Sequence, residues 1–368
     1  MRIAIVTLPL HTNYGGILQC YALQTVLERM GHEVYVLEKK RYTQTLLFKF
    51  LMVCKRLLKK YLLGDNIMLF PSHEYIYQCV NKFIRKYINI LYKRKWNSKT
   101  LGNFDVFVVG SDQIWRPEYF SPIENAFLAF AKDMCIKRIA YSASFGTDQC
   151  VYSSEQLAVC SDLLSKFDAV SVREDSGIRI CHEFFGVQAE QMLDPTLLLE
   201  ADDYRKLVSK VKTEPIKGNM LVYILDATEE KRKLVNEIAE DKGLTPFWLD
   251  NVIDICDASL EKSTLIPVEQ WIRAFDASSF IVTDSFHGCV FSIIFKKNFV
   301  VIGNANRGMV RFTSLLNMFS LMERLVSSLE EYRRKKQMLK MDIKYSPVYK
   351  KLAQERVRAF RFIEKNLA

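Results

Sequence analysis

The first forty residues contain the pattern that most restricts the fold. Residues 2–7 are apolar like a buried strand, 11–16 form a polar turn, 17–29 have helical spacing of apolar residues, and 33–38 are apolar again. A strand, a turn, a helix and a second strand in this order predict a parallel sheet of the Rossmann type. Gly15 and Gly16 lie in the turn but do not form GxGxxG, so they predict close approach of the backbone to a ligand rather than a dinucleotide site.

The same alternation continues through the 368-residue chain. Apolar strand patterns occur at 105–109, 138–143, 169–174, 220–225, 247–249, 280–283 and 299–303, and helical patterns at 154–166, 229–241, 268–275 and 346–365. We therefore expect an α/β protein with two Rossmann-like domains that face a central cleft. The expected boundaries are 1–200 with a basic helical insert at about 39–100, 201–340, and a helical tail at 341–368.

Positive charge is concentrated at the start of the chain. The net charge is +10, and residues 1–100 carry 17 Lys and Arg against 5 Asp and Glu. Within 39–63 the basic residues alternate with leucine and phenylalanine, which suits an anionic membrane surface or a polyanionic substrate. The alternative is a solvated helix whose apolar side packs on its own domain. No nucleic-acid-binding motif accompanies the charge, so no nucleic-acid partner is expected.

The cysteines and the hydropathy pattern favour a cytoplasmic protein. Nine cysteines are scattered without a CxxC pair, which favours reduced thiols over disulfides or a zinc site. No stretch is apolar for long enough to span a bilayer, and the opening residues lack the layout of a signal peptide. The basic stretch adds the hypothesis of peripheral contact with the inner membrane face.

One histidine lies where parallel α/β sheets bind ligands. His287 belongs to the run 283–288, TDSFHG, directly after the apolar strand pattern 280–282. Loops at the carboxyl ends of strands line the ligand crevice, and the helix that follows would favour an anion at its start. A histidine that is only structural at a strand end is the alternative, and Asp284 is open to the same reading.

An aspartate and three arginines follow other predicted strands. Asp112 follows 105–109, Arg173 follows 169–172, and Arg307 and Arg311 follow 299–303. Arginines bind phosphate and carboxylate in bidentate fashion, and a positioned histidine is a general acid or base. The set suits a small donor that carries both anionic groups. Asp112 is alternatively a helix cap, and no cluster has the spacing of metal ligands, so no metal is expected.

Five motifs in order make the chain resemble the polysaccharide pyruvyl transferase family. They are residues 14–19 (YGGILQ), 109–115 (VGSDQIW), 171–174 (SVRE), 193–196 (LDPT) and 284–288 (DSFHG). The resemblance implies a glycosyltransferase-B-like fold and phosphoenolpyruvate as donor substrate, without a further cofactor. It also implies that a pyruvate ketal is formed on a sugar of a cell-surface polysaccharide or of its lipid-linked precursor.

The resemblance also assigns residues. Asp112 and His287 match the family's motifs as catalytic residues, and Arg173 matches a donor-binding arginine. Many members have Arg-Leu-His where this chain has Ser285, Phe286 and His287, so a cation is missing at Ser285. Arg307 or Arg311, which are near in the sequence, would replace it. Together with the glycines of the first turn, the expected donor-binding residues are Arg173, Ser285, Arg307, Arg311, Gly15 and Gly16.

Two other functions remain open at the level of sequence. A glycosyltransferase that uses a nucleotide sugar would place its donor in the same cleft. A non-catalytic polysaccharide-assembly protein would keep the fold and bind sugar or membrane, and the serine at position 285 is the feature that keeps this reading open.

Overall fold

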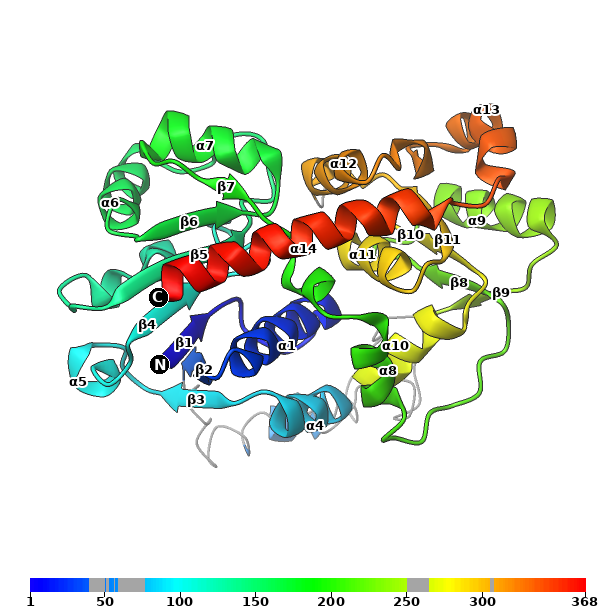
Figure 1. Cartoon of the computed structure of the whole chain (residues 1–368). Helices are drawn as coiled ribbons and strands as arrows, with labels where there is room; N and C mark the ends of the chain where they lie inside the picture. The colour runs from blue at the N-terminus through cyan, green and yellow to red at the C-terminus, as the bar shows by residue number, and fades with distance from the viewer. Residues whose placement is uncertain (40–49, 51–52, 56, 59–76, 250–264, 305–307) are drawn as a thin grey trace.

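Two parallel sheets with helices between their strands make up the protein (Figure 1). The computed structural model describes residues 1–39, 50, 53–55, 57–58, 77–249, 265–304 and 308–368. The first part contains β1 (Arg2–Val6), α1 (Tyr14–Arg29), β2 (Glu33–Lys39), α4 (Gln78–Tyr87), β3 (Ile90–Lys93), α5 (Ser98–Leu101), β4 (Val106–Val109), β5 (Lys137–Ala143), α6 (Ser154–Leu164), β6 (Ala169–Val172), α7 (Asp175–Phe185), β7 (Glu190–Gln191) and the 3₁₀ helix η3 (Pro195–Leu198).

The second part follows α8 (Ala201–Val208). It contains β8 (Met220–Tyr223), α9 (Glu229–Lys242), β9 (Pro246–Trp248), α10 (Val268–Ala277), β10 (Phe280–Thr283), α11 (Phe286–Ile294), β11 (Asn298–Ile302), α12 (Met309–Met318), β12 (Leu325–Val326), α13 (Leu329–Lys340) and α14 (Tyr345–Leu367). Short 3₁₀ helices, η1 (Ile123–Phe127), η2 (Ala129–Ala131) and η6 (Met322–Arg324), connect some of these elements.

Both sheets are parallel and have the doubly wound strand order of Rossmann-like domains. The first runs β3-β2-β1-β4-β5-β6-β7 and the second β12-β11-β10-β8-β9. All four residues of β4 and of β10 are buried, because helices cover both faces of these central strands. This explains why the strands are continuous apolar runs in the sequence. Because the strands are parallel, their carboxyl ends lie along one edge of each sheet, and the two edges supply the site described below.

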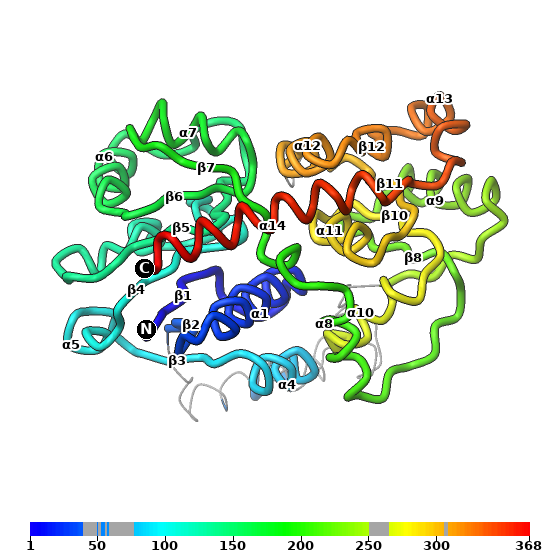
Figure 2. The backbone as a smooth tube through the Cα atoms, in the orientation of Figure 1, coloured from blue at the N-terminus to red at the C-terminus, as the bar shows by residue number. Residues whose placement is uncertain are grey.

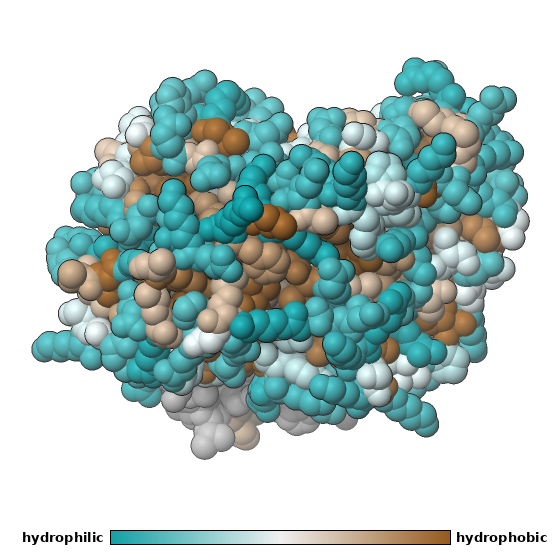
Figure 3. Space-filling model, viewed as in Figure 1, coloured by the Kyte–Doolittle hydropathy of each residue, from teal (hydrophilic) through white to brown (hydrophobic). Residues whose placement is uncertain are grey.

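The last helix, α14, contacts both domains. Helix α14 starts beside the second domain and runs back across the first (Figures 1 and 2). The ring of Phe362 packs against that of Tyr141, with 6.3 Å between centroids, and Lys137 Nζ donates to the carbonyl oxygen of Ala368 at 2.6 Å. Arg356 Nε donates to the carbonyl of Leu197 at 2.6 Å. The face that carries α14 is mostly hydrophilic, with apolar side chains between the charged ones (Figure 3).

Three sequence expectations change in detail. The stretch 39–100, expected to be a helical insert, also supplies β3, the edge strand of the first sheet. Helix α1 begins at Tyr14, so Gly15 and Gly16 lie in its first turn and not in the preceding loop. Helix α11 begins at Phe286 with Ser285 as its N-cap, so His287 lies in the first turn of this helix and not in the loop before it.

Most of the basic stretch 39–63 lies outside the described residues. Among the helices that the structure describes, none combines the length and the apolarity needed to cross a bilayer. Eight of the nine cysteines fall in the described part, and each of these eight is a free thiol.

Candidate active site

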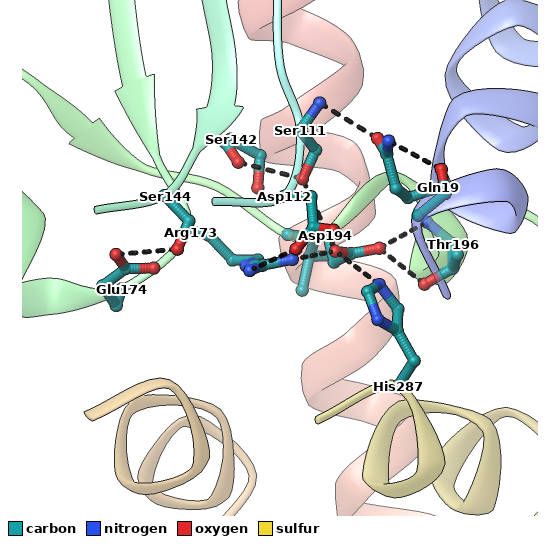
Figure 4. A network of polar contacts seen from close by, with 12 residues as sticks. Gln19, Ser111, Asp112, Ser142, Ser144, Arg173, Glu174, Asp194, Thr196 and His287 are labelled. Atoms are coloured by element: carbon teal, nitrogen blue, oxygen red, sulfur yellow. Dashed lines mark hydrogen bonds and ion pairs between the residues drawn. The ribbon is translucent and has the colours of Figure 1, made fainter. Parts of the chain in front are cut away.

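Four buried polar side chains from separate parts of the chain meet between the two sheets. Asp112 follows β4, Arg173 follows β6, and Asp194 lies between β7 and η3, so all three come from strand ends of the first domain. His287 reaches them from the first turn of α11 in the second domain (Figure 4). None of the four is more than 5% exposed. A cluster that neither domain could form alone therefore lies at the junction of the two.

Arg173 is the centre of this cluster. Its Nη1 lies 2.9 Å from Asp194 Oδ2, and its Nη2 lies 3.3 Å from Asp112 Oδ1. The remaining carboxylate oxygens are also used, since Asn13 Nδ2 donates to Asp112 Oδ2 at 3.0 Å and Thr196 donates twice to Asp194 Oδ1. One buried cation between two buried anions makes a charge network that is stable only while all its members are present.

The network shifts the ionisation of its carboxylates. Burial alone would raise the pKa of Asp112, but the positive charges of Arg173, His287 and Arg311 lower it overall. Burial would also raise the pKa of Asp194, but His287 and Arg173 lower this pKa far below its usual range. Both groups are therefore carboxylates near neutral pH, which makes Asp112 a weak proton acceptor.

These shifts predict how stability depends on pH. Both folded-state pKa values are depressed, so the stabilisation is fully present above the ordinary aspartate pKa of about 4 and is lost as the pH falls below it. We expect the urea midpoint to fall between pH 5 and pH 2, with a shallower dependence in Asp194→Asn. A variant with the same slope as the wild type would contradict the assignment of this stability to Asp194.

His287 places one ring nitrogen close to Asp194 and turns the other away from it. Its Nε2 lies 3.5 Å from Asp194 Oδ2, an ion-pair distance without a hydrogen bond, while Nδ1 points away from Asp194 (Figure 4). That side faces the first turn of α1, where a Cβ added to Gly15 would lie 1.9 Å from Nδ1. Only glycine at position 15 leaves room for the imidazole. The Asp194 carboxylate and the first turn of α1 together fix the orientation of the ring.

A cavity of about 680 Å³ opens beside these residues. Its buried floor includes Asp112, Ser285, His287 and Arg311, each less than 10% exposed. Burial lowers the pKa of Arg311 to about 10, and the nearby charge of Arg173 adds to this effect. An anion bound beside Arg311 would stabilise the charged guanidinium, because the attraction between them offsets the loss of hydration caused by burial.

Phe286 links the two arginines. The guanidinium of Arg173 lies 4.3 Å from the centroid of its ring, and that of Arg311 lies 5.5 Å from it. An aromatic ring attracts each nearby cation through the negative charge on its faces. Phe286 therefore helps to hold two arginines close to one cavity.

The structure brings together most, but not all, of the residues proposed from the sequence. Asp112, Arg173, His287 and Arg311 form or border the network, whereas Arg307 lies outside the described residues. Gly16 lines the cavity, and Ser285 both lines it and caps α11 through its hydroxyl.

Two of the proposed residues have contacts of another kind. Gly15 accommodates the His287 ring, as described above, rather than only freeing the backbone for a ligand. Asp284 accepts hydrogen bonds from Leu225 N at 2.6 Å and from Lys231 Nζ at 2.6 Å. Although Asp284 lines the cavity, these bonds join the ends of β8 and β10 to α9, which supports the structural reading of this aspartate.

Asp194 and Asn13 were missed as site residues by sequence reasoning. Asp194 precedes a proline in the run LDPT, a pattern that predicts a turn or the start of a 3₁₀ helix. Asp194 is indeed the N-cap of η3, in addition to its place in the site. Asn13 stands directly before α1 and reads as an N-cap, yet its side chain donates to Asp112 instead of capping the helix. The signal for Asp194 was its place after a strand, the same signal that singled out Asp112.

The described residues contain no group of three or more His, Cys, Asp or Glu side chains arranged to hold a metal ion.

Two Rossmann-like domains around a cleft, with a long last helix that returns to the first domain, define the glycosyltransferase-B class of fold. The UDP-GlcNAc 2-epimerase from Methanocaldococcus jannaschii is similar, with a TM-score of 0.51, 11% identity, and coverage of 98% of this chain and 100% of that one. Arabidopsis thaliana UGT89C1 complexed with UDP-L-rhamnose is also similar, with a TM-score of 0.50 and 11% identity. The match covers 100% of this chain and 97% of that one. At this identity the likeness shows the fold alone, and it confirms the architecture expected from the sequence.

The family assignment comes from the sequence itself. The polysaccharide pyruvyl transferase family matches residues 13–306, a span that includes every member of the buried network. The chain belongs to this family, as the five motifs predicted. No curated protein matches it significantly.

Proposed function

We propose that this protein transfers a pyruvyl group from phosphoenolpyruvate to two hydroxyls of a saccharide and forms a ketal. The observation that carries the proposal is His287, held by Asp194 on the floor of the cavity beside the buried Arg311. A proton donor next to a site for an anion is what the addition of an alcohol to an anionic enol requires. Membership of the family supports the same reaction.

Arg311 and the start of α11 hold the donor in this proposal. Phosphoenolpyruvate carries a phosphate and a carboxylate, and Arg311 pairs with one of them. The N-terminal end of α11, capped by Ser285, adds the partial positive charge of a helix start. Arg173 is already paired with two carboxylates, so it acts by positioning Asp112 and Asp194 and not as a direct ligand of the donor.

The chemistry proceeds in two steps. In the first step the imidazolium of His287 gives a proton to the methylene carbon, which becomes a methyl group, while a sugar hydroxyl bonds to the central carbon. The imidazole then accepts the proton of the hydroxyl. Asp112 does not accept it, because its lowered pKa makes it the weaker base. In the second step a neighbouring hydroxyl replaces phosphate on the same carbon, and its proton leaves with the phosphate.

The test measures phosphate released from phosphoenolpyruvate in the presence of lipid-linked or cell-surface oligosaccharides. We expect acceptor-dependent release by the wild type and a loss of at least about 100-fold in His287→Ala, the usual range for a general acid or base. His182→Ala is the matched control, because His182 is an exposed histidine on α7.

The possible results of this test distinguish the proposed reaction from a non-catalytic role. Equal release by His287→Ala and wild type would remove His287 from the chemistry. Absence of release with every acceptor, together with absence of donor binding, would overturn the proposed reaction and favour a non-catalytic role.

A further inference from the structure

A second cavity, of about 630 Å³, lies in the second domain. Its walls come from the end of α12, from η6, from the end of α13 and from the start of α14, all in the second domain (Figure 1). Asn298, the first residue of β11, donates to Asp342 Oδ1 at 2.6 Å and accepts from Ile343 N at 2.8 Å. This wall is therefore fixed to the amino end of β11, whereas the candidate active site lies at the carboxyl ends of the strands.

Most of the residues that line this second cavity are apolar. Phe319, Leu321 and Val348 are each at most 4% exposed, so they form a buried wall. Met338 and Met341 are partly exposed at the mouth, with 38% and 62% of their surface accessible. Methionine side chains are flexible and adapt to apolar groups of different shape. A fixed apolar wall with an adaptable mouth suits a flexible apolar chain.

Arg324 brings a buried positive charge to this apolar cavity. Its side chain is 4% exposed, and its Nη2 donates to the carbonyl of Met341 at 2.9 Å. Its Nε lies 3.4 Å from Glu323 Oε1, an ion-pair distance without a hydrogen bond, and its Nη1 has no hydrogen-bond partner among the described residues. A buried N–H group without a partner is unfavourable, and a ligand that carries a hydrogen-bond acceptor removes this penalty.

The other charges around the cavity also favour an anion. The lining contains three cations and two carboxylates, namely Arg324, Lys344, Lys351, Glu323 and Asp342. Glu323 is paired with Arg324, and Asp342 accepts from the amide that starts β11, so both carboxylates already have partners. Lys351 pairs with Glu355 at 2.7 Å. Lys344 is exposed and forms no ion pair with a carboxylate in the described part of the chain, so it is available to a ligand.

We infer that this cavity binds an amphipathic anion, an unbranched apolar chain that ends in a phosphate or carboxylate group. The anionic group lies between Nη1 of Arg324 and the ammonium group of Lys344, and the chain lies along the buried apolar wall. Access to Nη1 requires a small shift of side chains, which the methionines at the mouth accommodate. The inference does not depend on the proposed function, because none of the described residues lines both this cavity and the candidate active site.

Calorimetric titration with alkyl phosphates below their critical micelle concentrations tests the inference. Octyl phosphate is expected to bind with 1:1 stoichiometry, and each methylene removed from the buried part of the chain weakens binding by up to about fourfold. Octyl glucoside has the same chain on a neutral head group, and inorganic phosphate is the head group alone. Both are expected to bind at least about tenfold more weakly than octyl phosphate. Phosphoenolpyruvate is not expected to compete with it.

Two variants change the charge at the proposed position of the head group. Arg324→Gln is expected to weaken octyl phosphate binding by at least about tenfold, because a hydrogen bond to a charged group is lost. Lys344→Glu is expected to weaken it roughly two- to fivefold, the range for an exposed charge. Lys350→Glu is the matched control, because Lys350 is an exposed lysine of α14 outside the cavity. Since Lys344 is exposed, its variant decides the test even if Arg324→Gln does not fold.

Equal binding of octyl phosphate by wild type and Lys344→Glu, or by wild type and a folded Arg324→Gln, would overturn the inference. Equal binding of octyl glucoside, or absence of octyl phosphate binding by the wild type, would overturn it as well. Vesicles of phosphatidylglycerol distinguish two sources of the same chemistry. Cosedimentation that Lys344→Glu reduces would assign the ligand to a membrane lipid, and octyl phosphate binding without cosedimentation would assign it to a soluble amphiphile.

Discussion

Substitution of Arg173 by methionine is expected to lower the free energy of unfolding by about 3–5 kcal/mol. The methionine fills a similar volume but leaves Asp112 and Asp194 buried without the cation between them. Each of these side chains is at most 2% exposed, so water cannot replace the lost guanidinium. Breaking one member of a buried charge network is costly for this reason, even where the whole network adds little net stability.

Urea denaturation followed by circular dichroism measures this effect. Arg179→Met is the matched control, because the Arg179–Glu183 pair on α7 is about half exposed on both sides. Exposed pairs contribute about 0–1 kcal/mol, so the control is expected to stay close to the wild type. A similar change in both variants would show that the two carboxylates do not depend on Arg173.

Gly15→Ala is expected to reduce phosphate release by about 100-fold or more while the protein remains folded. The added Cβ would lie 1.9 Å from Nδ1 and 2.2 Å from Cγ of His287, so the ring must leave its place beside Asp194. A displacement of about 1 Å at a catalytic group is enough for a loss of this size. Alanine also favours the helix more than glycine does, so α1 itself is not weakened.

The neighbouring glycine provides the comparison. A Cβ at Gly16 would lie 3.1 Å from Asn13 Nδ2 and 3.4 Å from Asp112 Oδ2, distances that small shifts of side chains accommodate. Gly16→Ala is therefore expected to reduce turnover much less than Gly15→Ala. Equal turnover by Gly15→Ala and wild type would show that His287 does not need its observed position. Thermal unfolding of both variants excludes loss of the fold as the cause.

The fold was predictable because the strands are buried on both faces. The runs of β4, β8 and β10 are fully buried and that of β1 is buried after Arg2, so none has the polar alternation that would allow an edge or antiparallel assignment. The edge strand β3 was missed because it is four residues long and only partly buried, so its apolar pattern is weak.

The candidate site was predictable only as a set of strand ends. The sequence places Asp112, Arg173 and His287 after apolar runs, and the structure brings these three together with Asp194. The pairing of Asp194 with His287 was not predictable, because the two residues are 93 positions apart in the chain and no local pattern records such a contact. Gly15 was assigned to the backbone approach of a ligand, since its neighbour in space comes from the other domain.

The return of α14 to the first domain has a consequence for synthesis. Lys137 meets the carbonyl oxygen of Ala368 across a separation of 231 residues, and Phe362 covers Tyr141. A chain that emerges from the ribosome starting at its N-terminus has all seven strands of the first sheet available well before this helix appears. The surface around Tyr141 therefore stays uncovered until α14 has been synthesised, and the first domain reaches its finished form only after the second has been made.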